Sequence, residues 1–106
     1  MKTYRVSFRP EARSDLQNIY QIIAADSPTR AAAYIRRIHD ACAGLRDMPF
    51  RGRARNDLLP GLRVLPFERR IIIAYRIEHD RVRVVGVFYG GRDYETLLRD
   101  HGGDDG

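Results

Sequence analysis

Several features are scarce in this sequence of 106 residues, and each scarcity excludes a class of protein. Cys42 is the only cysteine, so an internal disulfide is impossible. No apolar run approaches the roughly 20 residues that span a bilayer, and the start lacks the apolar core of a signal peptide. The length suits one domain. We therefore expect a single cytoplasmic domain without a membrane segment.

Side chains that perform catalysis or bind metals are also scarce. His39, His79 and His101 are the only histidines, and no pair of them has the spacing of metal ligands, so no metal site is expected. No glycine-rich loop of a nucleotide-binding type is present, and no cofactor is expected. Cys42 falls on an inward-facing helical position, which predicts a buried apolar role and not a nucleophile.

Positive charge, in contrast, is abundant, and nearly all of it is arginine. The chain has 19 basic and 14 acidic residues, a formal net charge of +5, and Lys2 as its only lysine. Arginine binds carboxylates and phosphates through a planar fork but is poor at transferring protons. A coding bias toward arginine is an alternative origin of this ratio. In either case the surface is suited to binding an acidic macromolecule.

Hydrophobic periodicity predicts an α+β fold. The predicted elements follow in the order strand 4–8, helix 10–25, helix 28–47, loop 50–61, strand 62–66, strand 69–77, strand 81–89 and a short terminal segment 92–99. The short junction between the helices makes them antiparallel neighbours. The fold class is therefore β-α-α-β-β-β, an antiparallel sheet with a helical hairpin packed on one face. Residues 1–100 form one domain, and residues 101–106 a flexible tail.

Short motifs are distributed along residues 2–99: Tyr4-Arg5-Val6-Ser7, Ala12-x-x-Asp15-Leu16-x-x-Ile19-Tyr20, Pro49-Phe50-Arg51-Gly52-Arg53, Pro60-Gly61-Leu62-Arg63, Ile73-Ala74-Tyr75-Arg76 and Val85-Gly86-Val87-Phe88-Tyr89-Gly90-Gly91-Arg92-Asp93-Tyr94. Taken together, these motifs resemble the RelE/ParE toxin superfamily, and its ParE-like branch in particular. The resemblance implies the toxin of a type II toxin–antitoxin pair, in a hetero-oligomer with a ParD-like or similar antitoxin that neutralises it. ParE-like members poison DNA gyrase without acting as enzymes.

Two alternatives stay open. RelE-like members of the superfamily cleave mRNA on the ribosome, and in that interpretation Arg92 and Tyr94 resemble their late active-site residues. The sequence has few candidate groups for proton transfer, which argues against mRNA cleavage. Apart from Arg92 and Tyr94 in this alternative, no catalytic residue is assigned. The second alternative is a non-catalytic binding module.

The predicted binding residues form two groups. The target-binding group gathers arginines of the central loop and the end of the last strand: Arg51, Arg53, Arg55, Arg63, Arg92 and Asp93. For the loop arginines, the alternative is a solvated surface. The antitoxin-binding group is Tyr4, Tyr20 and Tyr34, for which core packing is the alternative. An antitoxin helix along the hairpin and an added strand at a sheet edge are the expected modes of binding.

Overall fold

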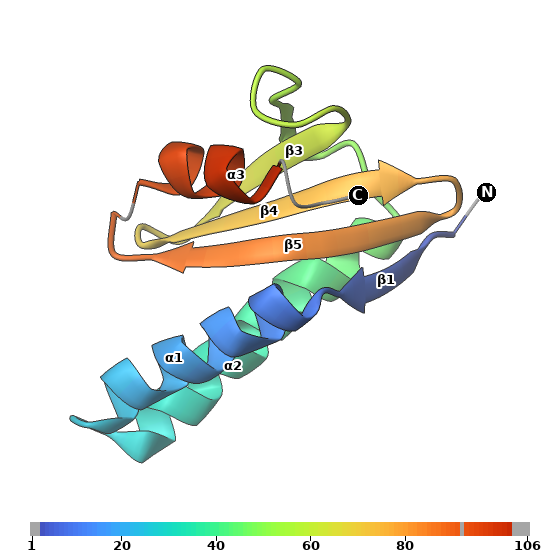
Figure 1. Ribbon diagram of the computed structural model, residues 1–106. Coiled ribbons are helices and arrows are strands. Elements are labelled where there is room, and N and C mark those ends of the chain that lie inside the picture. The colour runs from blue at the N-terminus through green and yellow to red at the C-terminus, as the bar shows by residue number, and fades with distance from the viewer. Residues whose placement is uncertain (1–2, 92, 103–106) are drawn as a thin grey trace.

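The structure is a computed structural model, which describes residues 3–91 and 93–102. Its centre is a sheet in the order β1-β5-β4-β3-β2 (Figure 1). The strands are β1 (Arg5–Phe8), β2 (Arg53–Ala54), β3 (Leu62–Phe67), β4 (Ile71–Glu78) and β5 (Arg81–Tyr89). β3, β4 and β5 form the antiparallel meander that short turns impose, and β4 lies in the middle.

Two antiparallel helices, α1 (Pro10–Ala24) and α2 (Pro28–Ala43), cover one face of the sheet (Figure 1). Both begin with proline, which fits the first helical turn because its missing N–H has no partner there. Ser27 caps α2, since its hydroxyl accepts the N–H of Arg30 at 3.2 Å. The apolar stripes of both helices face the sheet and build the main core with it. This core includes Leu16, Ile19, Ile38, Cys42, Ile73, Tyr75 and Val84.

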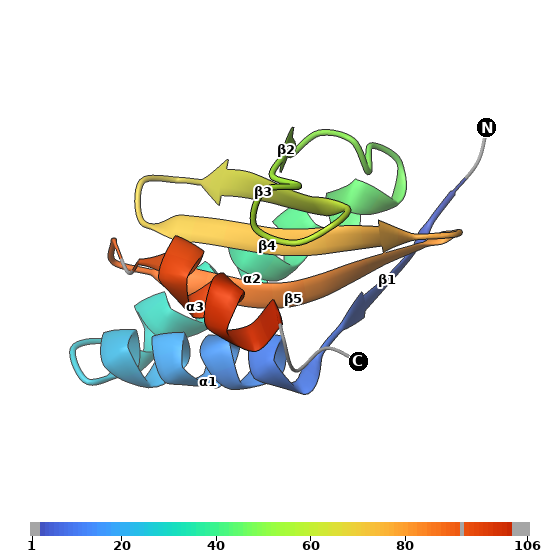
Figure 2. The same cartoon turned by 45° about the horizontal axis from the view of Figure 1, so that its top comes forward.

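A third helix, α3 (Tyr94–Gly102), lies on the opposite face of the sheet together with the loop before β3 (Figure 2). Under them is a second, smaller apolar cluster of Leu58, Leu62, Val64, Ala74, Val85, Phe88 and Leu98. β4 therefore contributes side chains alternately to two apolar layers, which explains its nearly continuous apolar run.

The predicted fold class is confirmed, and three details of it are corrected. β1 pairs with β5 in parallel, so the sheet is mixed at this edge. The predicted second helix ends at Ala43 and continues as a 3₁₀ turn, η1 (Gly44–Arg46). The terminal segment is α3.

The boundaries of the loop and the tail also change. The predicted loop contains β2, which pairs with β3. Of the predicted tail, residues 101 and 102 belong to α3, and residues 103–106 lie outside the described part of the chain. No helix within the described ranges combines the length and apolarity needed to cross a bilayer.

Candidate interaction surfaces

The loop before β2 is fixed from below by a buried tyrosine. Tyr75 on β4 is fully buried, and its hydroxyl accepts the N–H of Gly52 at 2.8 Å and donates to the carbonyl of Pro49 at 2.7 Å. Burial raises the pKa of Tyr75, so the phenol stays protonated and able to donate. A Cβ atom on Gly52 would lie 2.7 Å from this hydroxyl and 2.9 Å from the carbonyl oxygen of Val64. Only glycine lets the backbone come this close.

Arg63 on β3 holds the same loop from the side. Its Nη1 donates to the carbonyl of Gly52 at 2.7 Å and to that of Phe50 at 3.3 Å. Its guanidinium lies over the Phe50 ring, 5.0 Å from the centroid. This predicted target-binding arginine therefore positions the loop, in addition to any contact it makes with a target.

The surface of this loop combines exposed apolar and basic side chains. Met48 and Phe50 are 60% and 62% exposed, although both are large apolar residues. Arg51 and Arg53, two of the predicted target-binding residues, are exposed beside them. Aromatic residues and arginines on a rigid support are typical of the residues that dominate binding energy in protein interfaces. We call residues 48–54 the Phe50 loop.

Arg55, another predicted target-binding residue, joins the next stretch of the loop to α3. Its Nη2 lies 2.8 Å from Asp57 and 2.5 Å from Glu95, and its Nη1 lies 3.3 Å from the hydroxyl of Tyr94. The side chain of Arg55 is only 14% exposed. Hydrogen bonding to Arg55 lowers the pKa of Asp57 to about 2. This arginine, like Arg63, is engaged within the fold.

The end of β5 leads into α3 through the remaining predicted residues. Asp93 precedes α3 and accepts the N–H of Thr96 at 3.2 Å and its hydroxyl at 2.6 Å, which lowers the pKa of Asp93. The carboxylate thus satisfies the exposed N-terminal end of α3. Tyr94, the candidate nuclease residue, also packs against Phe88 with ring centroids 6.0 Å apart. Arg92 lies outside the described residues.

These contacts bear on the chemistry that the site can perform. General acid–base catalysis requires a group that exchanges a proton near neutral pH. Asp57 and Glu95 are ion-paired with Arg55, and the low pKa of Asp57 makes it a weak base. Among the described residues, no group of three or more His, Cys, Asp or Glu side chains could hold a metal ion. The arrangement around Arg55 suits a structural joint.

The helical side of the molecule carries two adjoining hollows that contain two of the predicted antitoxin-binding tyrosines. A hollow of about 670 Å³ contains Tyr4, and one of about 480 Å³ contains Tyr20. Both are lined by Phe8 and His39, whose rings lie 5.4 Å apart. We call this continuous surface the tyrosine groove. Phe8 and His39 were not predicted as binding residues from the sequence. For His39 a signal was present, because its four-residue spacing from Ile35 places these two side chains on one side of α2.

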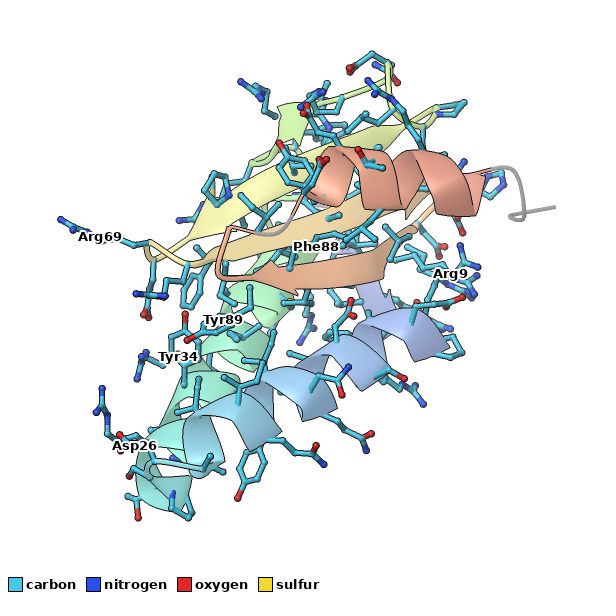
Figure 3. All side chains as sticks on the ribbon, turned by 60° about the vertical axis from the view of Figure 1, so that its left-hand side comes forward. Arg9, Asp26, Tyr34, Arg69, Phe88 and Tyr89 are labelled. Atoms are coloured by element: carbon cyan, nitrogen blue, oxygen red, sulfur yellow. The ribbon has the colours of Figure 1, made fainter. Side chains whose placement is uncertain are left out.

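Tyr34, the third predicted antitoxin-binding residue, lies elsewhere. It lines a separate hollow of about 680 Å³, where its ring meets that of Tyr89 edge-on at 6.3 Å (Figure 3). Arg37 covers the Tyr34 ring at 5.1 Å and forms an ion pair with Glu68 at 2.8 Å. Partial burial raises the pKa of Tyr34. The structure therefore brings Tyr4 and Tyr20 together but separates Tyr34 from them.

Comparison with known proteins finds similarity both in sequence and in structure. The sequence model of a family described as the ParE toxin of the type II toxin–antitoxin system parDE matches residues 6–94. A chain of the chromosomal ParDE toxin–antitoxin system from P. aeruginosa has a similar structure, with a TM-score of 0.71 and 20% identity, covering 82% of this chain and 96% of that one. A chain of the toxin–antitoxin complex RelBE2 from Mycobacterium tuberculosis has a TM-score of 0.62 and 26% identity, covering 85% and 94%. No curated protein matches the sequence.

Proposed function

Because the chain belongs to the ParE toxin family of type II toxin–antitoxin systems, we propose that it poisons DNA gyrase by binding it and that a ParD-like antitoxin neutralises it. The observation that carries the gyrase proposal is the Phe50 loop. Two large apolar side chains and two arginines are presented there on a backbone that Tyr75 and Arg63 hold in place. A rigid, partly apolar surface of this kind loses little conformational entropy when it binds a large protein.

The Arg55 joint supports binding over cleavage. An mRNA nuclease needs groups that take a proton from the 2′-hydroxyl and give one to the leaving oxygen. Tyr94 and the carboxylates beside it are instead hydrogen-bonded to a single arginine that joins α3 to the loop. Their use in catalysis would require the joint to open.

The tyrosine groove is the proposed docking site of the antitoxin. Tyr20 is 38% exposed at the groove, and Phe8 supplies an apolar floor. Arg13 lines one hollow, and Arg5 and Arg46 line the other, which favours a partner with acidic residues. We propose that an amphipathic antitoxin helix places its apolar side chains in this groove.

The test is a supercoiling assay with purified gyrase from the source organism, relaxed plasmid and increasing amounts of the purified chain. We expect loss of supercoiling and accumulation of linear DNA after detergent and protease treatment. Adding the cognate antitoxin should restore supercoiling. Unchanged supercoiling at a tenfold molar excess over gyrase would exclude this gyrase as the target.

Ribosome-dependent mRNA cleavage remains the second candidate, because the RelBE2 toxin–antitoxin complex has a similar fold and Tyr94 lies beside Arg55. It predicts cut mRNA on programmed ribosomes and loss of cutting in Tyr94→Phe. Intact mRNA would exclude it. The third candidate, an inert binding module, predicts normal growth when the chain is expressed without an antitoxin.

A further inference from the structure

The hollow that contains Tyr34 lies on a part of the surface that the proposed function leaves unused, and we call it the Tyr34 hollow. It lies between the α1–α2 turn at Asp26 and the β3–β4 turn at Arg69 (Figure 3). The N–H of Gly90 donates to the carbonyl of Arg70 at 2.9 Å, which holds the end of β5 against the β3–β4 turn. Segments that are far apart in the chain therefore combine to form this hollow.

The wall of the Tyr34 hollow is apolar and aromatic. Ile22, Ile23 and Ala33 line it from the two helices, and Ile22 is 59% exposed although it is aliphatic. Tyr34 and Tyr89 point toward each other across it (Figure 3). Within the described part of the chain, neither of these two hydroxyls has a hydrogen-bond partner, so both are available to donate to a ligand. The wall thus offers contacts to an apolar group and to a hydrogen-bond acceptor.

Positive charge surrounds this wall and exceeds the negative charge. Four arginines and two carboxylates line the hollow: Arg30, Arg37, Arg69, Arg70, Asp26 and Glu68. Arg37 is paired with Glu68 at 2.8 Å, and Arg30 lies 3.8 Å from Asp26. Among the described residues, Arg69 and Arg70 have no ion-pair partner, and both are exposed. Two positive charges are therefore left to attract an anionic ligand.

This combination indicates an acidic protein segment as the ligand. Guanidinium groups bind carboxylates through charge-assisted hydrogen bonds, and tyrosine and arginine are enriched among the residues that dominate protein interfaces. A nucleic-acid backbone suits the hollow less, because it gains nothing from the apolar wall and is repelled by Asp26 and Glu68. We propose that the Tyr34 hollow binds an acidic segment of a partner protein, with an apolar side chain against the wall and carboxylates on Arg69 and Arg70.

The Tyr34 hollow and the tyrosine groove lie on opposite sides of α2. Tyr34 and Arg37 line the hollow, whereas Ile35 and His39 line the groove. With about 3.6 residues per turn, these two pairs point in nearly opposite directions from the helix axis. Both surfaces can therefore be occupied at the same time. The proposal goes beyond the proposed function, which places an antitoxin helix in the tyrosine groove.

The first experiment titrates the full chain, labelled with ¹⁵N, with the synthetic peptide Glu-Asp-Glu-Phe-Glu-Leu-Asp-Glu and follows the backbone amides by NMR. We expect saturable shifts concentrated at residues 22–37, 68–70 and 89, and an affinity that falls as salt screens the charges. A matched peptide with Gln and Asn in place of Glu and Asp should bind at least about tenfold more weakly, because the arginines no longer attract it.

Two arginine variants separate the hollow from the general positive charge of the chain. Arg69→Gln/Arg70→Gln should weaken binding of the acidic peptide about three- to tenfold. Arg36→Gln/Arg81→Gln removes the same charge from exposed positions outside the hollow and should change the affinity less than about twofold.

Two tyrosine variants separate the hollow from the tyrosine groove. Tyr34→Phe/Tyr89→Phe keeps both rings but removes both hydroxyls, and should weaken peptide binding about threefold or more. Tyr20→Ala alters the tyrosine groove and should bind the peptide as the parent does.

Thermal melting checks that each variant is folded, and the shift map of the parent protein does not depend on any variant. Shifts centred on the tyrosine groove or the Phe50 loop, equal affinity for the acidic and neutral peptides, or equal affinity of the two arginine variants would overturn the proposal. The absence of saturable shifts at about 1 mM peptide would also overturn it. Displacement of the peptide by a lower concentration of a DNA duplex would overturn it in favour of a phosphate ligand.

Discussion

The hydroxyl of Tyr75 lies 2.8 Å from the backbone nitrogen of Gly52, at the point where the centre of the sheet meets the Phe50 loop. The same hydroxyl reaches the carbonyl of Pro49 at 2.7 Å, so one buried phenol satisfies a donor and an acceptor of a loop 23 residues or more away in the chain. Both hydrogen bonds are buried, so water does not readily replace the Tyr75 hydroxyl as the partner of these backbone groups. The conformation of the proposed gyrase-binding surface therefore depends on a core residue.

Tyr75→Phe is expected to destabilise the protein although it leaves the apolar core filled. The change deprives the Gly52 N–H and the Pro49 carbonyl of their partner, which costs about 1–3 kcal/mol in total free energy of unfolding. Urea denaturation measures this cost, and hydrogen exchange at Gly52 should become faster than in the parent protein. Tyr20→Phe, which removes a hydroxyl from an exposed side chain, serves as the control and should change stability little. Equal stability of Tyr75→Phe and the parent would contradict the structural role.

Gly52→Ala tests the same contact from the opposite side. The new methyl group would lie 2.7 Å from the Tyr75 hydroxyl and 2.9 Å from the Val64 carbonyl, so the loop must move. We expect a loss of about 1–3 kcal/mol in the free energy of unfolding and weaker gyrase inhibition. Gly44→Ala is the matched control, because a methyl group there meets nothing within 4 Å and the backbone is helical. That control should be neutral or stabilising by up to about 1 kcal/mol.

The Arg55 joint predicts a specific acid dependence. The pKa of Asp57 is lowered from 3.8 to about 2 by its hydrogen bonds to Arg55, so folding favours the ionised carboxylate. Its contribution to stability is complete above the unfolded-state pKa, about 3.9, and is lost as the pH falls through about 2. Asp57→Asn should therefore be less stable than the parent at pH 7, and the difference should shrink between about pH 4 and pH 2.

Urea midpoints measured across this pH range provide the comparison. Asp26→Asn is the control, because Asp26 and its partner Arg30 are 85% and 78% exposed and 3.8 Å apart. Such a surface pair contributes little, so its removal should have little effect at any pH. If the deficit of Asp57→Asn stays constant down to pH 2, the Asp57 carboxylate does not stabilise the Arg55 joint through its charge.

The fold was largely predictable because its signals are local. The apolar run of β4, the Ser27–Pro28 start of α2 and the stripes of both helices each identify an element within a few residues. The parallel pairing of β1 with β5 was not predictable, because the alternation of a strand is the same in either orientation. α3 was missed as a helix because its two buried or half-buried leucines, at 97 and 98, give too short a stripe.

The candidate site was predictable only as a set of residue types. Arg51, Arg55 and Arg63 look equivalent in the sequence, yet the first is exposed and the other two are engaged within the fold. Arg55 meets Glu95 from 40 positions away, and no local pattern indicates such a contact.

The proposed division between a gyrase-binding loop and an antitoxin-binding groove predicts opposite effects of two substitutions. Phe50→Ala removes an exposed apolar side chain from the Phe50 loop, where truncation of an anchor typically costs 2 kcal/mol or more, roughly a thirtyfold loss of gyrase affinity. Antitoxin binding should be unchanged. Tyr20→Ala should do the reverse, weakening the antitoxin complex and preserving inhibition of supercoiling.

Both variants alter exposed side chains, so neither is expected to unfold the protein, and thermal melting checks this. Gyrase inhibition is measured by titration in the supercoiling assay, and antitoxin affinity by calorimetry with the cognate antitoxin. Arg51→Gln and Arg53→Gln extend the test, because each should weaken gyrase binding with a stronger effect at low salt, where exposed charges are least screened. A parallel loss of both activities in Phe50→Ala would show that gyrase and antitoxin compete for the Phe50 loop and that the tyrosine groove is not a separate site.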